Sequence, residues 1–462
     1  MNPTATLHVD APVRTSVDVA VVGSGPSGLS AAISAARRGA RTLVIERFGY
    51  VGGNLTAGLV GPCMTSYSLD GSTQLIKGVF EELVLRMEEQ GQAIHPSKVP
   101  ANSPYCGYIT YGHDKVTPFE PEAVKLTGLD MLREAGVEIL FHTSVIAPRT
   151  EGERVTGLFV ASKSGIEAID ASVVIDCSAD ADVVAGAGGE TVYGRNEDGL
   201  AQPMTLFFRI AGVDDAAVDK YVTEAQEFRP FASIVEKARQ SGEFTIPRKG
   251  IGLYKTLRPG VWRINTTRIL GVSGVDVADL TKAEIEGREQ VQQLVDFLRR
   301  RIPGFSDATL LDTASTIGVR ETRRIVGDYT LTLKDLETGR HFEDVIGTCG
   351  YPVDIHSPVD EGGRLEDDET ANVYEMPYRM LVPRDLDGVL VAGRCVSASH
   401  EALAAIRVMP PSFAMGQAAG TAAALAVAAG VQPRSVDVAT LQHQLLEDGA
   451  YLGPEMVPET VG

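Results

Sequence analysis

The 462-residue sequence has few basic residues relative to its acidic ones. It contains 42 Lys and Arg against 61 Asp and Glu, so its formal net charge is −19. A strongly acidic chain is repelled by the phosphates of nucleic acids and by anionic lipid surfaces. The charge therefore argues against nucleic acid as a partner and against binding to a membrane surface.

Cysteine is also scarce, and its spacing argues against two kinds of chemistry. The five cysteines are widely separated and form no Cys-x-x-Cys pair: Cys63, Cys106, Cys177, Cys349 and Cys395. Such a pattern offers neither a zinc site nor a redox dithiol, so no metal site is predicted. An odd number of isolated cysteines fits a reducing compartment, and we expect buried or partly buried thiols.

Long apolar runs are rare in the sequence. Residues 1–16 are polar, include two prolines and lack the apolar core of a secretory signal, so we expect a flexible leader and a cytoplasmic protein. Residues 413–430 approach the length of a membrane span. They are dominated by alanine and glycine and include Gln417 and Thr421, which predicts a buried helix and no membrane association.

The first fifty residues contain closely spaced glycines between two apolar runs. Residues 16–22 read as a buried strand, residues 29–38 have helical spacing, and residues 41–46 read as a second strand. Between the first strand and the helix lies Gly-Ser-Gly-Pro-Ser-Gly, residues 23–28. A glycine-rich turn in this context predicts a Rossmann-type βαβ unit that holds a dinucleotide.

Each glycine of this turn has a separate expected role. Gly23 permits the tight turn, Gly25 lets the backbone approach a pyrophosphate, and Gly28 lets the helix lie close to the strand. Pro26 and Ser27 begin the helix, whose amino terminus is expected to face the phosphates.

An acidic residue ends the second strand. Glu46 can accept hydrogen bonds from both ribose hydroxyls, and it would repel the 2′-phosphate of NADP. Residues 47–61 then crowd five glycines among apolar side chains, as expected of a loop that follows an extended ligand. We expect cofactor contacts in this loop from Arg47, Gly52, Gly53 and Asn54.

These features, with residues 317–332 and 377–424, resemble a known family. The chain is similar to the two-domain flavoprotein superfamily that includes the flavoprotein subunits of succinate dehydrogenase and fumarate reductase. Within it, the chain resembles the FAD-dependent oxidoreductase group. The resemblance implies FAD as the cofactor. Larger relatives attach FAD through a histidine in the glycine-rich loop, and residues 52–58 contain none, so we expect noncovalent FAD.

The carboxyl-terminal part offers a second set of cofactor contacts. Residues 389–392 predict a buried strand, and Gly393 and Arg394 follow it as a turn at which ligands of open α/β sheets bind. Two prolines then begin the alanine-rich helix, where free amides can face an anion. The resemblance implies that residues 408–413 approach the isoalloxazine, through Met409, Pro411 and Ser412.

The middle of the chain predicts the rest of a flavin-binding domain. Residues 120–135 read as an amphipathic helix, and residues 137–182 read as strands with a small β meander. The resemblance places the adenine near Val145 and passes the cofactor at the turn that contains Ala179 and Asp180. The family form of this turn is Asp-Ala-Thr-Gly-Asp, from which Ser178 and Ala179 depart.

The predicted fold is α/β, with a Rossmann-type FAD-binding domain (a parallel sheet plus a β meander) and an inserted α+β substrate domain. The predicted boundaries are 1–16 for the leader, 17–61, 119–189 and 386–440 for the FAD-binding domain, 62–118 and 190–385 for the substrate domain, and 441–462 for a tail.

Four side chains are candidates for chemistry on the substrate. Arg320 and Arg407 could clamp an anionic group, and imidazoles such as His356 and His400 can shuttle a proton near neutral pH. For His356 a structural role is an equal alternative, and the resemblance favours the site because the group carries Asp-x-His there. Arg323 and Arg324 are expected instead to form ion pairs with Glu321 on a surface helix.

The sequence predicts an oxidoreductase that transfers a hydride between flavin N5 and a small polar substrate. No second strand-GxGxxG-helix unit is present, so the electron acceptor or donor is a separate molecule of unknown type. One alternative is a flavin monooxygenase or oxidase, and another is an RNA-associated or assembly flavoprotein. The substrate, the direction of the reaction and the oligomeric state, including a homo-oligomer, are left open.

Overall fold

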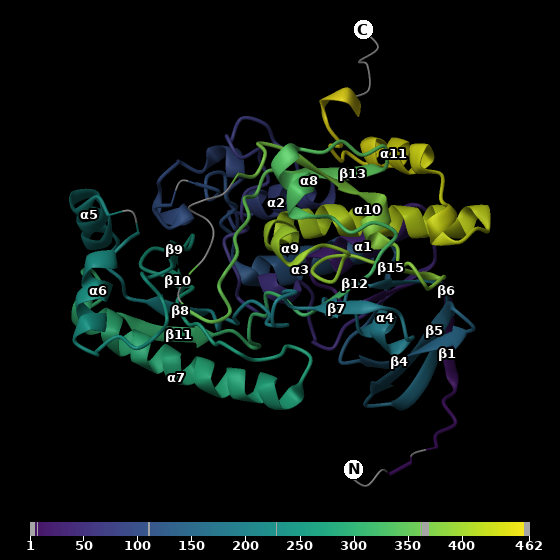
Figure 1. Cartoon of the computed structure of the whole chain (residues 1–462), viewed down its shortest axis with the longest axis horizontal. Coiled ribbons are helices and arrows are strands. Elements are labelled where there is room, and N and C mark those ends of the chain that lie inside the picture. The colour runs from purple at the N-terminus through teal and green to yellow at the C-terminus, as the bar shows by residue number, and fades with distance from the viewer. Residues whose placement is uncertain are drawn as a thin grey trace.

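A parallel sheet lies at the centre of the larger part of the molecule (Figure 1). The computed structural model describes residues 5–6, 8–109, 111–227, 229–360, 362 and 369–456. Five parallel strands follow the order β3 (Glu138–Leu140), β2 (Thr42–Ile45), β1 (Val13–Val22), β6 (Gly165–Asp176) and β15 (Val389–Val391). The α/β fold class and the predicted strands at 16–22, 41–46 and 389–392 are confirmed.

The predicted β meander extends the same sheet. Strands β4 (Ser144–Glu151) and β5 (Arg154–Ser162) run antiparallel to each other, and β5 pairs with the first half of β6. The second half of β6 pairs with β15, so β6 belongs to both the meander and the parallel sheet. Turns fall at the two predicted positions, near residues 152 and 164.

The prediction of a flexible leader over residues 1–16 is wrong for its last four residues. Strand β1 begins at Val13, and Thr15 and Ser16 pair with Ile169 and Asp170 of β6. The Ser16 hydroxyl also donates to the Asp170 carboxylate at 3.3 Å. Polar side chains that bond across two strands hold this segment, so its low hydrophobicity did not reveal a strand.

Five helices cover the sheet and one another (Figure 1): α1 (Pro26–Arg37), α2 (Val79–Glu89), α3 (Pro121–Glu134), α10 (Met409–Ala429) and α11 (Val438–Glu447). Helices α1 and α3 confirm the predicted helices. In contrast, the predicted tail 441–462 is wrong in part, because α11 reaches Glu447 and buries Leu441 and Leu445.

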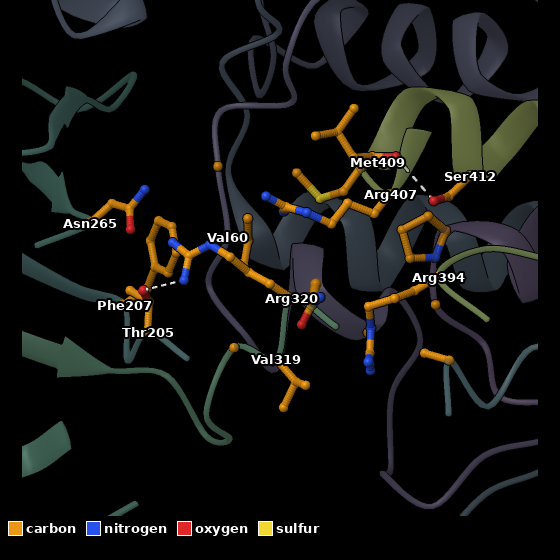
Figure 2. A pocket seen from close by; sticks show the side chains of 18 of the residues that line it. Val60, Thr205, Phe207, Asn265, Val319, Arg320, Arg394, Arg407, Met409 and Ser412 are labelled. Carbon is orange, nitrogen blue, oxygen red and sulfur yellow. Dashed lines mark hydrogen bonds between the residues drawn. The ribbon is translucent and has the colours of Figure 1, made fainter. Parts of the chain in front are cut away.

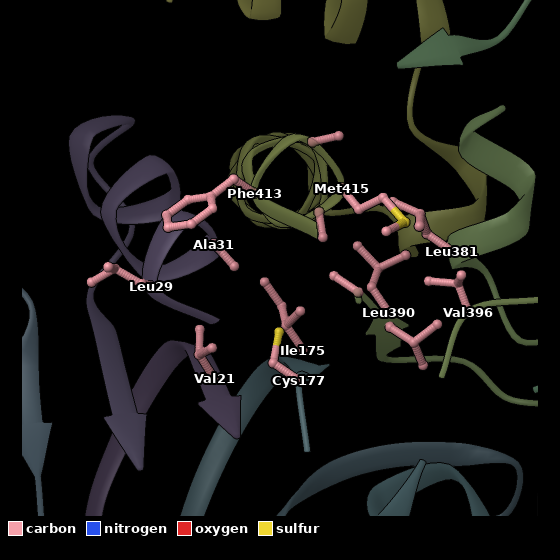
Figure 3. Packing of buried hydrophobic residues seen from close by; sticks show 14 of the residues in the cluster. Val21, Leu29, Ala31, Ile175, Cys177, Leu381, Leu390, Val396, Phe413 and Met415 are labelled. Carbon is pink, nitrogen blue, oxygen red and sulfur yellow. The ribbon is translucent and has the colours of Figure 1, made fainter. Parts of the chain in front are cut away.

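Helix α10 is the long apolar segment of the sequence, and it packs closely on α1 (Figure 3). A Cβ atom at Gly416 or at Gly420 would lie 2.1 Å from a carbonyl oxygen of α1. By length and composition α10 could cross a membrane, but 72% of its most apolar window is buried inside the protein. The prediction of a buried helix is confirmed, and glycine and alanine are needed there because the helix axes lie close together.

A second layer has its own small sheet and hydrophobic core (Figure 1). Its sheet follows the order β11 (Thr309–Thr313), β8 (Phe208–Ala211), β10 (Trp262–Ile264) and β9 (Leu253–Lys255). The helices of this layer are α5 (Asp215–Ala225), α6 (Ala232–Gln240) and α7 (Val277–Arg301). This layer is the inserted α+β domain that the sequence predicts.

The inserted domain is smaller than predicted. Its core contains residues between 204 and 317 together with Leu59, whereas buried residues between 325 and 386 and between 63 and 93 belong to the core of the larger domain. The boundaries 62–118 and 190–385 are therefore wrong. These segments belong to the larger domain because α2 and β13 (Val345–Cys349) pack against its helix α10.

The remaining elements are short and lie between the two cores or on the larger one. They are β7 (Thr191–Tyr193) with β12 (Arg323–Ile325), β14 (Tyr374–Pro377) with β13, and the helices α4 (Asp182–Gly186), α8 (Leu333–Thr338) and α9 (His400–Ile406).

Candidate functional site

One cavity of about 1260 Å³ lies between the two cores and is lined by residues from both. Pockets for drug-sized ligands usually enclose about 300–1,000 Å³, so this cavity has room for a long ligand and a second molecule. Figure 2 shows that Arg320 and Arg407 extend toward the side of Thr205 and Asn265, while Arg394 points away from them. The cavity therefore has two differently built ends.

Most of the site residues predicted from the sequence line this cavity. They are Gly23, Gly25, Pro26, Ser27, Glu46, Arg47, Gly53, Asn54, Val145, Ala179, Asp180, Arg320, His356, Gly393, Arg394, Arg407, Met409 and Ser412. The structure thus brings together segments that are separated by almost 390 residues. We call the part around Gly23, Gly25, Glu46, Gly53 and Arg394 the cofactor end.

Four predicted site residues do not line the cavity: Gly28, Gly52, Pro411 and His400. Gly28 has a packing role, because a Cβ there would lie 1.8 Å from the carbonyl oxygen of Gly23. Gly52 has a φ of 108° and donates its N–H to Ser24 O at 2.8 Å, so it shapes the loop. Pro411 is buried in the first turn of α10.

The glycines of the cofactor end leave room for a ligand against the backbone. Gly23 has a φ of 88°, as its predicted tight turn requires. A Cβ at Gly53 would lie 2.8 Å from the Cα of Gly25, so the two backbones nearly touch. A Cβ at Gly25 would meet no protein atom closer than 3.8 Å, so the space beside this residue opens into the cavity. The amino terminus of α1 lines this space.

Glu46 is held rigidly at the cavity wall. Its Oε2 accepts hydrogen bonds from the N–H and the hydroxyl of Ser24 at 2.8 and 2.6 Å, and its Oε1 accepts from the N–H of Phe48 at 2.9 Å. A carboxylate offers about four acceptor positions, so Oε1 can still accept a hydrogen bond from a ribose hydroxyl.

The turn after β6 has a backbone conformation typical of glycine, although an alanine occupies the position. Ala179 has a φ of 71°, in the left-handed region that favours glycine. The turn is held by the buried Asp176, which accepts from Ser178 N at 3.0 Å and from Val183 N at 2.8 Å. Ala179 therefore carries backbone strain at a position that the family form gives to glycine.

Arg394 joins this turn to the end of β15. Its guanidinium donates to the Asp180 carboxylate and to the Thr322 hydroxyl, both at 2.9 Å. Thr322 in turn donates to Asp180 at 2.7 Å. These three side chains fix the two loops that form the wall of the cofactor end.

The start of α10 differs from the prediction in one respect. The sequence suggested free amides facing an anion, but Pro410 and Pro411 have no N–H and Ser412 N donates to Val408 O at 3.3 Å. Only Met409 can offer a free N–H in this turn. The cavity is lined here by Val408, Met409 and Ser412. This turn therefore shapes the cavity wall more than it supplies hydrogen-bond donors.

The opposite part of the cavity, which we call the substrate end, contains Arg248, Arg320, Asp354, His356 and Arg407. Arg320 donates from Nη1 to Pro203 O and to the Thr205 hydroxyl, both at 2.7 Å; Figure 2 shows the second of these bonds. Arg407 donates from Nη2 to the backbone oxygen of Asp354 at 3.0 Å.

Asp354 contacts three side chains at the substrate end. Its Oδ2 lies 3.4 Å from His356 Nε2 and 3.6 Å from Arg407 Nη2, and it accepts from the Tyr351 hydroxyl at 3.2 Å. Burial favours the neutral acid, but His356, Arg407 and Arg320 together hold the pKa of Asp354 well below its usual range. The carboxylate is therefore ionised.

His356 is neutral at ordinary pH. Burial lowers its pKa to about 3, because the effect of burial and of the nearby Arg320 exceeds the opposing effect of Asp354. A neutral imidazole next to a carboxylate can accept a proton, and the carboxylate stabilises the imidazolium that forms. This geometry suits a group that accepts a proton from a substrate.

His400, the second candidate for proton transfer, does not line the cavity. Its Nδ1 is 2.8 Å from Glu321, whose fully buried carboxylate also pairs with Arg324. The expected surface helix is wrong too, because Arg323 and Arg324 belong to β12. Arg323 pairs with Asp182, outside the helix that the sequence suggested. The sequence did not reveal this buried cluster because His400 and Glu321 are 79 residues apart.

The sequence analysis missed several residues of the substrate end: Thr205, Arg248, Tyr254, Arg268, Tyr351 and Asp354. Only Asp354 had a local signal, since it stands two residues before His356. Tyr351 follows β13 in the larger domain, and the others come from loops and short strands of the inserted domain, where no spacing pattern separates a site residue from a surface residue.

All five cysteines are buried and free, as expected. Cys177 lines the cavity, but burial raises the pKa of its thiol far above neutral pH. Its thiol is therefore not a nucleophile under ordinary conditions.

The residues of the cofactor end fit FAD. The open space beside Gly25 admits a pyrophosphate to the backbone, the free acceptor position of Glu46 admits a ribose, and the cavity continues to Met409 for the rest of the molecule. FAD would thus be held mainly by backbone groups and short side chains.

Comparisons with known proteins agree with this fit. A family model described as FAD dependent oxidoreductase matches residues 18–445. Thiamine thiazole synthase of Aeropyrum pernix is 30% identical over 143 residues, which are 31% of this chain and 43% of that protein. Ferredoxin–NADP reductase 2 of Oceanobacillus iheyensis is 32% identical over 110 residues, 24% of this chain and 29% of that protein. The chain thus matches less than half the length of these curated relatives.

A solved structure of a geranylgeranyl bacteriochlorophyll reductase-like protein from Thermoplasma acidophilum superposes with a TM-score of 0.47 and 14% identity, covering 95% of this chain and 84% of its own. The family assignment rests on the family model, which spans nearly the whole chain, and on the cavity that fits the cofactor. The chain belongs to the FAD dependent oxidoreductase family.

Proposed function

We propose that this protein is a dehydrogenase or reductase that transfers a hydride between flavin N5 and a small polar substrate held at the substrate end. The observation that carries the proposal is the single cavity, in which the cofactor end continues into the cluster of Arg320, Asp354, His356 and Arg407. When bound, FAD supplies the two-electron redox chemistry.

In this proposal the arginines orient the substrate. Two neutral oxygens, Pro203 O and Thr205 Oγ1, hold Arg320 through its Nη1, so the direction of its guanidinium is fixed. Arg407 is held by the Asp354 backbone and by Gln202. Side chains fixed in this way lose little entropy when they bind a polar group.

In this proposal His356 accepts the proton that the substrate loses. Because it is neutral, it can accept a proton from a hydroxyl or amine group of the substrate as that group is oxidised, and Asp354 stabilises the charge that appears.

An anaerobic screen tests the proposal. Sugars, hydroxy acids, enoates and amines are mixed with the FAD-bound protein, and loss of the flavin colour is followed. For a compound that bleaches the parent, we expect His356→Ala to slow bleaching by about 10²- to 10⁴-fold, as for other general bases. Arg320→Ala should raise the half-saturating concentration. The matched controls are His443→Ala and Arg299→Ala, which alter exposed helical residues.

Equal bleaching by the parent, His356→Ala and Arg320→Ala would contradict the assignment of the site. Stopped-flow reoxidation in air examines the oxygen-using alternative. A slow return of the oxidised spectrum supports a dehydrogenase or reductase, and a rapid return supports a monooxygenase or oxidase.

We also propose that the protein works in the cytoplasm, free of membranes and nucleic acid, and exchanges electrons with a separate acceptor or donor. The net charge of −19 supports the absence of binding to nucleic acid and to anionic membranes. Salt-sensitive retention of RNA by the purified protein would contradict it.

A further inference from the structure

We propose that Gln202 is a positioning residue, which aligns His356 and Arg407 for the reaction although it lies outside the cavity. This inference rests on the proposed function, because it adds a residue to the same site. Gln202 does not line the cavity, and only 1% of its surface is exposed. Any effect of Gln202 on the reaction must therefore pass through the residues that it contacts.

The first observation is the bonding of the Gln202 side chain. Its Oε1 accepts a hydrogen bond from the backbone N–H of His356 at 3.4 Å and another from Nη2 of Arg407 at 3.3 Å. Both neighbours are N–H donors, so the oxygen of the amide must face them. One buried atom thus holds the proposed proton acceptor and an arginine of the substrate end in place relative to each other.

The second observation is the chain segment that contains Gln202. Residues 202–205 lie between β7 and β8, and they also hold Arg320. Nη1 of Arg320 donates to Pro203 O and to the Thr205 hydroxyl, both at 2.7 Å. Four consecutive residues therefore contact all three side chains to which the proposed function gives a role in orienting the substrate or accepting its proton.

The backbone of this segment is paired with two other loops. Thr205 and Gly318 exchange two backbone hydrogen bonds, at 3.0 and 2.8 Å, and Met204 and Ile269 exchange two more at 3.0 Å. A paired backbone cannot shift without leaving buried polar groups unsatisfied. The side chain at position 202 is therefore held from a fixed base.

The backbone of Gln202 is itself anchored by Glu321, whose carboxylate is fully buried. Glu321 Oε2 accepts a hydrogen bond from Gln202 N at 3.0 Å, and the carboxylate also pairs with His400 Nδ1 at 2.8 Å and with Arg324. Burial raises the pKa of Glu321, but these contacts together lower it below its usual value. A buried carboxylate paired on several sides is costly to displace. The cluster of Glu321, Arg324 and His400 thus fixes Gln202 from outside the cavity.

Two substitutions of Gln202 and one control variant test the inference on the FAD-bound protein. Gln202→Met keeps the length of the side chain and removes the acceptor. Gln202→Glu keeps the acceptor, and it breaks no other bond, because Nε2 of Gln202 has no hydrogen-bond partner among the described residues. The control is Gln442→Met in α11, since Gln442 is also buried and hydrogen-bonded but lies outside the cavity.

Anaerobic bleaching of the flavin is followed with a compound that bleaches the parent. We expect Gln202→Met to slow bleaching at saturation by about 3- to 10-fold, which corresponds to about 0.6–1.4 kcal/mol, the contribution of one ordinary hydrogen bond. The half-saturating concentration should rise by a similar factor, because Arg407 loses a contact. Gln202→Glu should recover part of both losses, and Gln442→Met should retain the values of the parent.

A double-mutant cycle separates positioning from a general loss of structure. If Gln202 acts on the rate through His356, adding Gln202→Met to His356→Ala should slow bleaching by less than about twofold, whereas independent effects would multiply. Full multiplication would overturn the inference, as would a Gln202→Met variant with the rate and half-saturating concentration of the parent. If Gln202→Met does not load FAD, Gln202→Asn, which draws the oxygen back by one methylene group, takes its place with the same expectations.

Crystal structures of the FAD-bound parent and of FAD-bound Gln202→Met test the inference without a substrate. We expect the Arg407 guanidinium and the His356 backbone to move by about 0.5 Å or more, which is enough to degrade a preorganised site. If neither group moves while substrates bleach the parent, the proposed function stands and the positioning role is wrong. If both groups move while no compound of any class bleaches the parent, the positioning by Gln202 stands and the proposed redox function is wrong.

Discussion

At its cofactor end the cavity is lined by backbone and short side chains, whereas at its substrate end it is lined by long charged side chains. The cofactor end depends on conformation: the φ of 88° at Gly23, the contact of Gly25 with Gly53, and the left-handed Ala179. The substrate end depends on charge, with Arg248, Arg320 and Arg407 close to one carboxylate. Changes of shape should therefore damage the first end, and changes of charge the second.

The largest expected effect comes from filling the space beside Gly25. A Cβ atom there would meet no protein atom closer than 3.8 Å, so we expect Gly25→Val to fold but to occupy the place of the pyrophosphate. We expect the FAD content of the purified protein to fall by at least about tenfold, because the backbone can no longer approach the phosphates. Flavin absorbance against protein concentration measures it.

The control for this variant is Gly136→Ala. Gly136 also has open space around it and a φ of 79°, but it lies outside the cavity. This variant should lose a little stability and keep its FAD. If Gly25→Val is as fully loaded as Gly136→Ala, the location of the cofactor end is wrong.

A smaller effect is expected at the substrate end, on the pH dependence of stability. The pKa of His356 is about 3 in the folded protein and near 6.5 in the unfolded chain. Between these values the unfolded chain binds a proton that the folded protein does not, so stability falls as the pH falls from 6.5 to 3. Replacing the histidine removes this contribution.

His356→Gln should therefore lose less stability on acidification than the parent, by up to about 1.4 kcal/mol per pH unit in that window. Urea unfolding at a series of pH values measures the slope. The exposed His443 provides the control variant His443→Gln, which should keep the slope of the parent. A parent-like slope for His356→Gln would show that this end of the cavity does not hold a neutral histidine.

The smallest effect is expected at the turn of the cofactor end. Ala179 adopts a φ of 71°, and a left-handed alanine costs about 1 kcal/mol more than a glycine. Ala179→Gly should therefore raise the free energy of unfolding by up to about 1 kcal/mol. Ala217→Gly in α5, where the alanine is helical, should lower it by a similar amount. Equal losses in both variants would rule out strain at this turn.

The difference between the two ends also explains what the sequence could predict. The βαβ unit, Glu46 and the strand before Gly393 have local patterns, because a tight turn or a buried strand constrains neighbouring residues. Most cofactor residues could therefore be identified without coordinates. The exceptions, Gly28, Gly52 and Pro411, support the turn, the loop and the helix next to the cavity.

The substrate end had almost no local signal. Arg248 stands in a loop of the inserted domain, and nothing in its neighbours distinguishes it from a surface arginine. Its role depends on residues 72 and 159 positions away, Arg320 and Arg407, and on which of them pairs with Asp354. The same reason explains why the pairing of His400 with Glu321 was not predicted, since the two residues are distant in the sequence but adjacent in the fold.

The most direct test of the central claim is a crystal structure of the protein with FAD. We expect FAD to extend from Glu46 to the turn at Met409. An isoalloxazine ring located away from Met409 would contradict the division of the cavity into two ends.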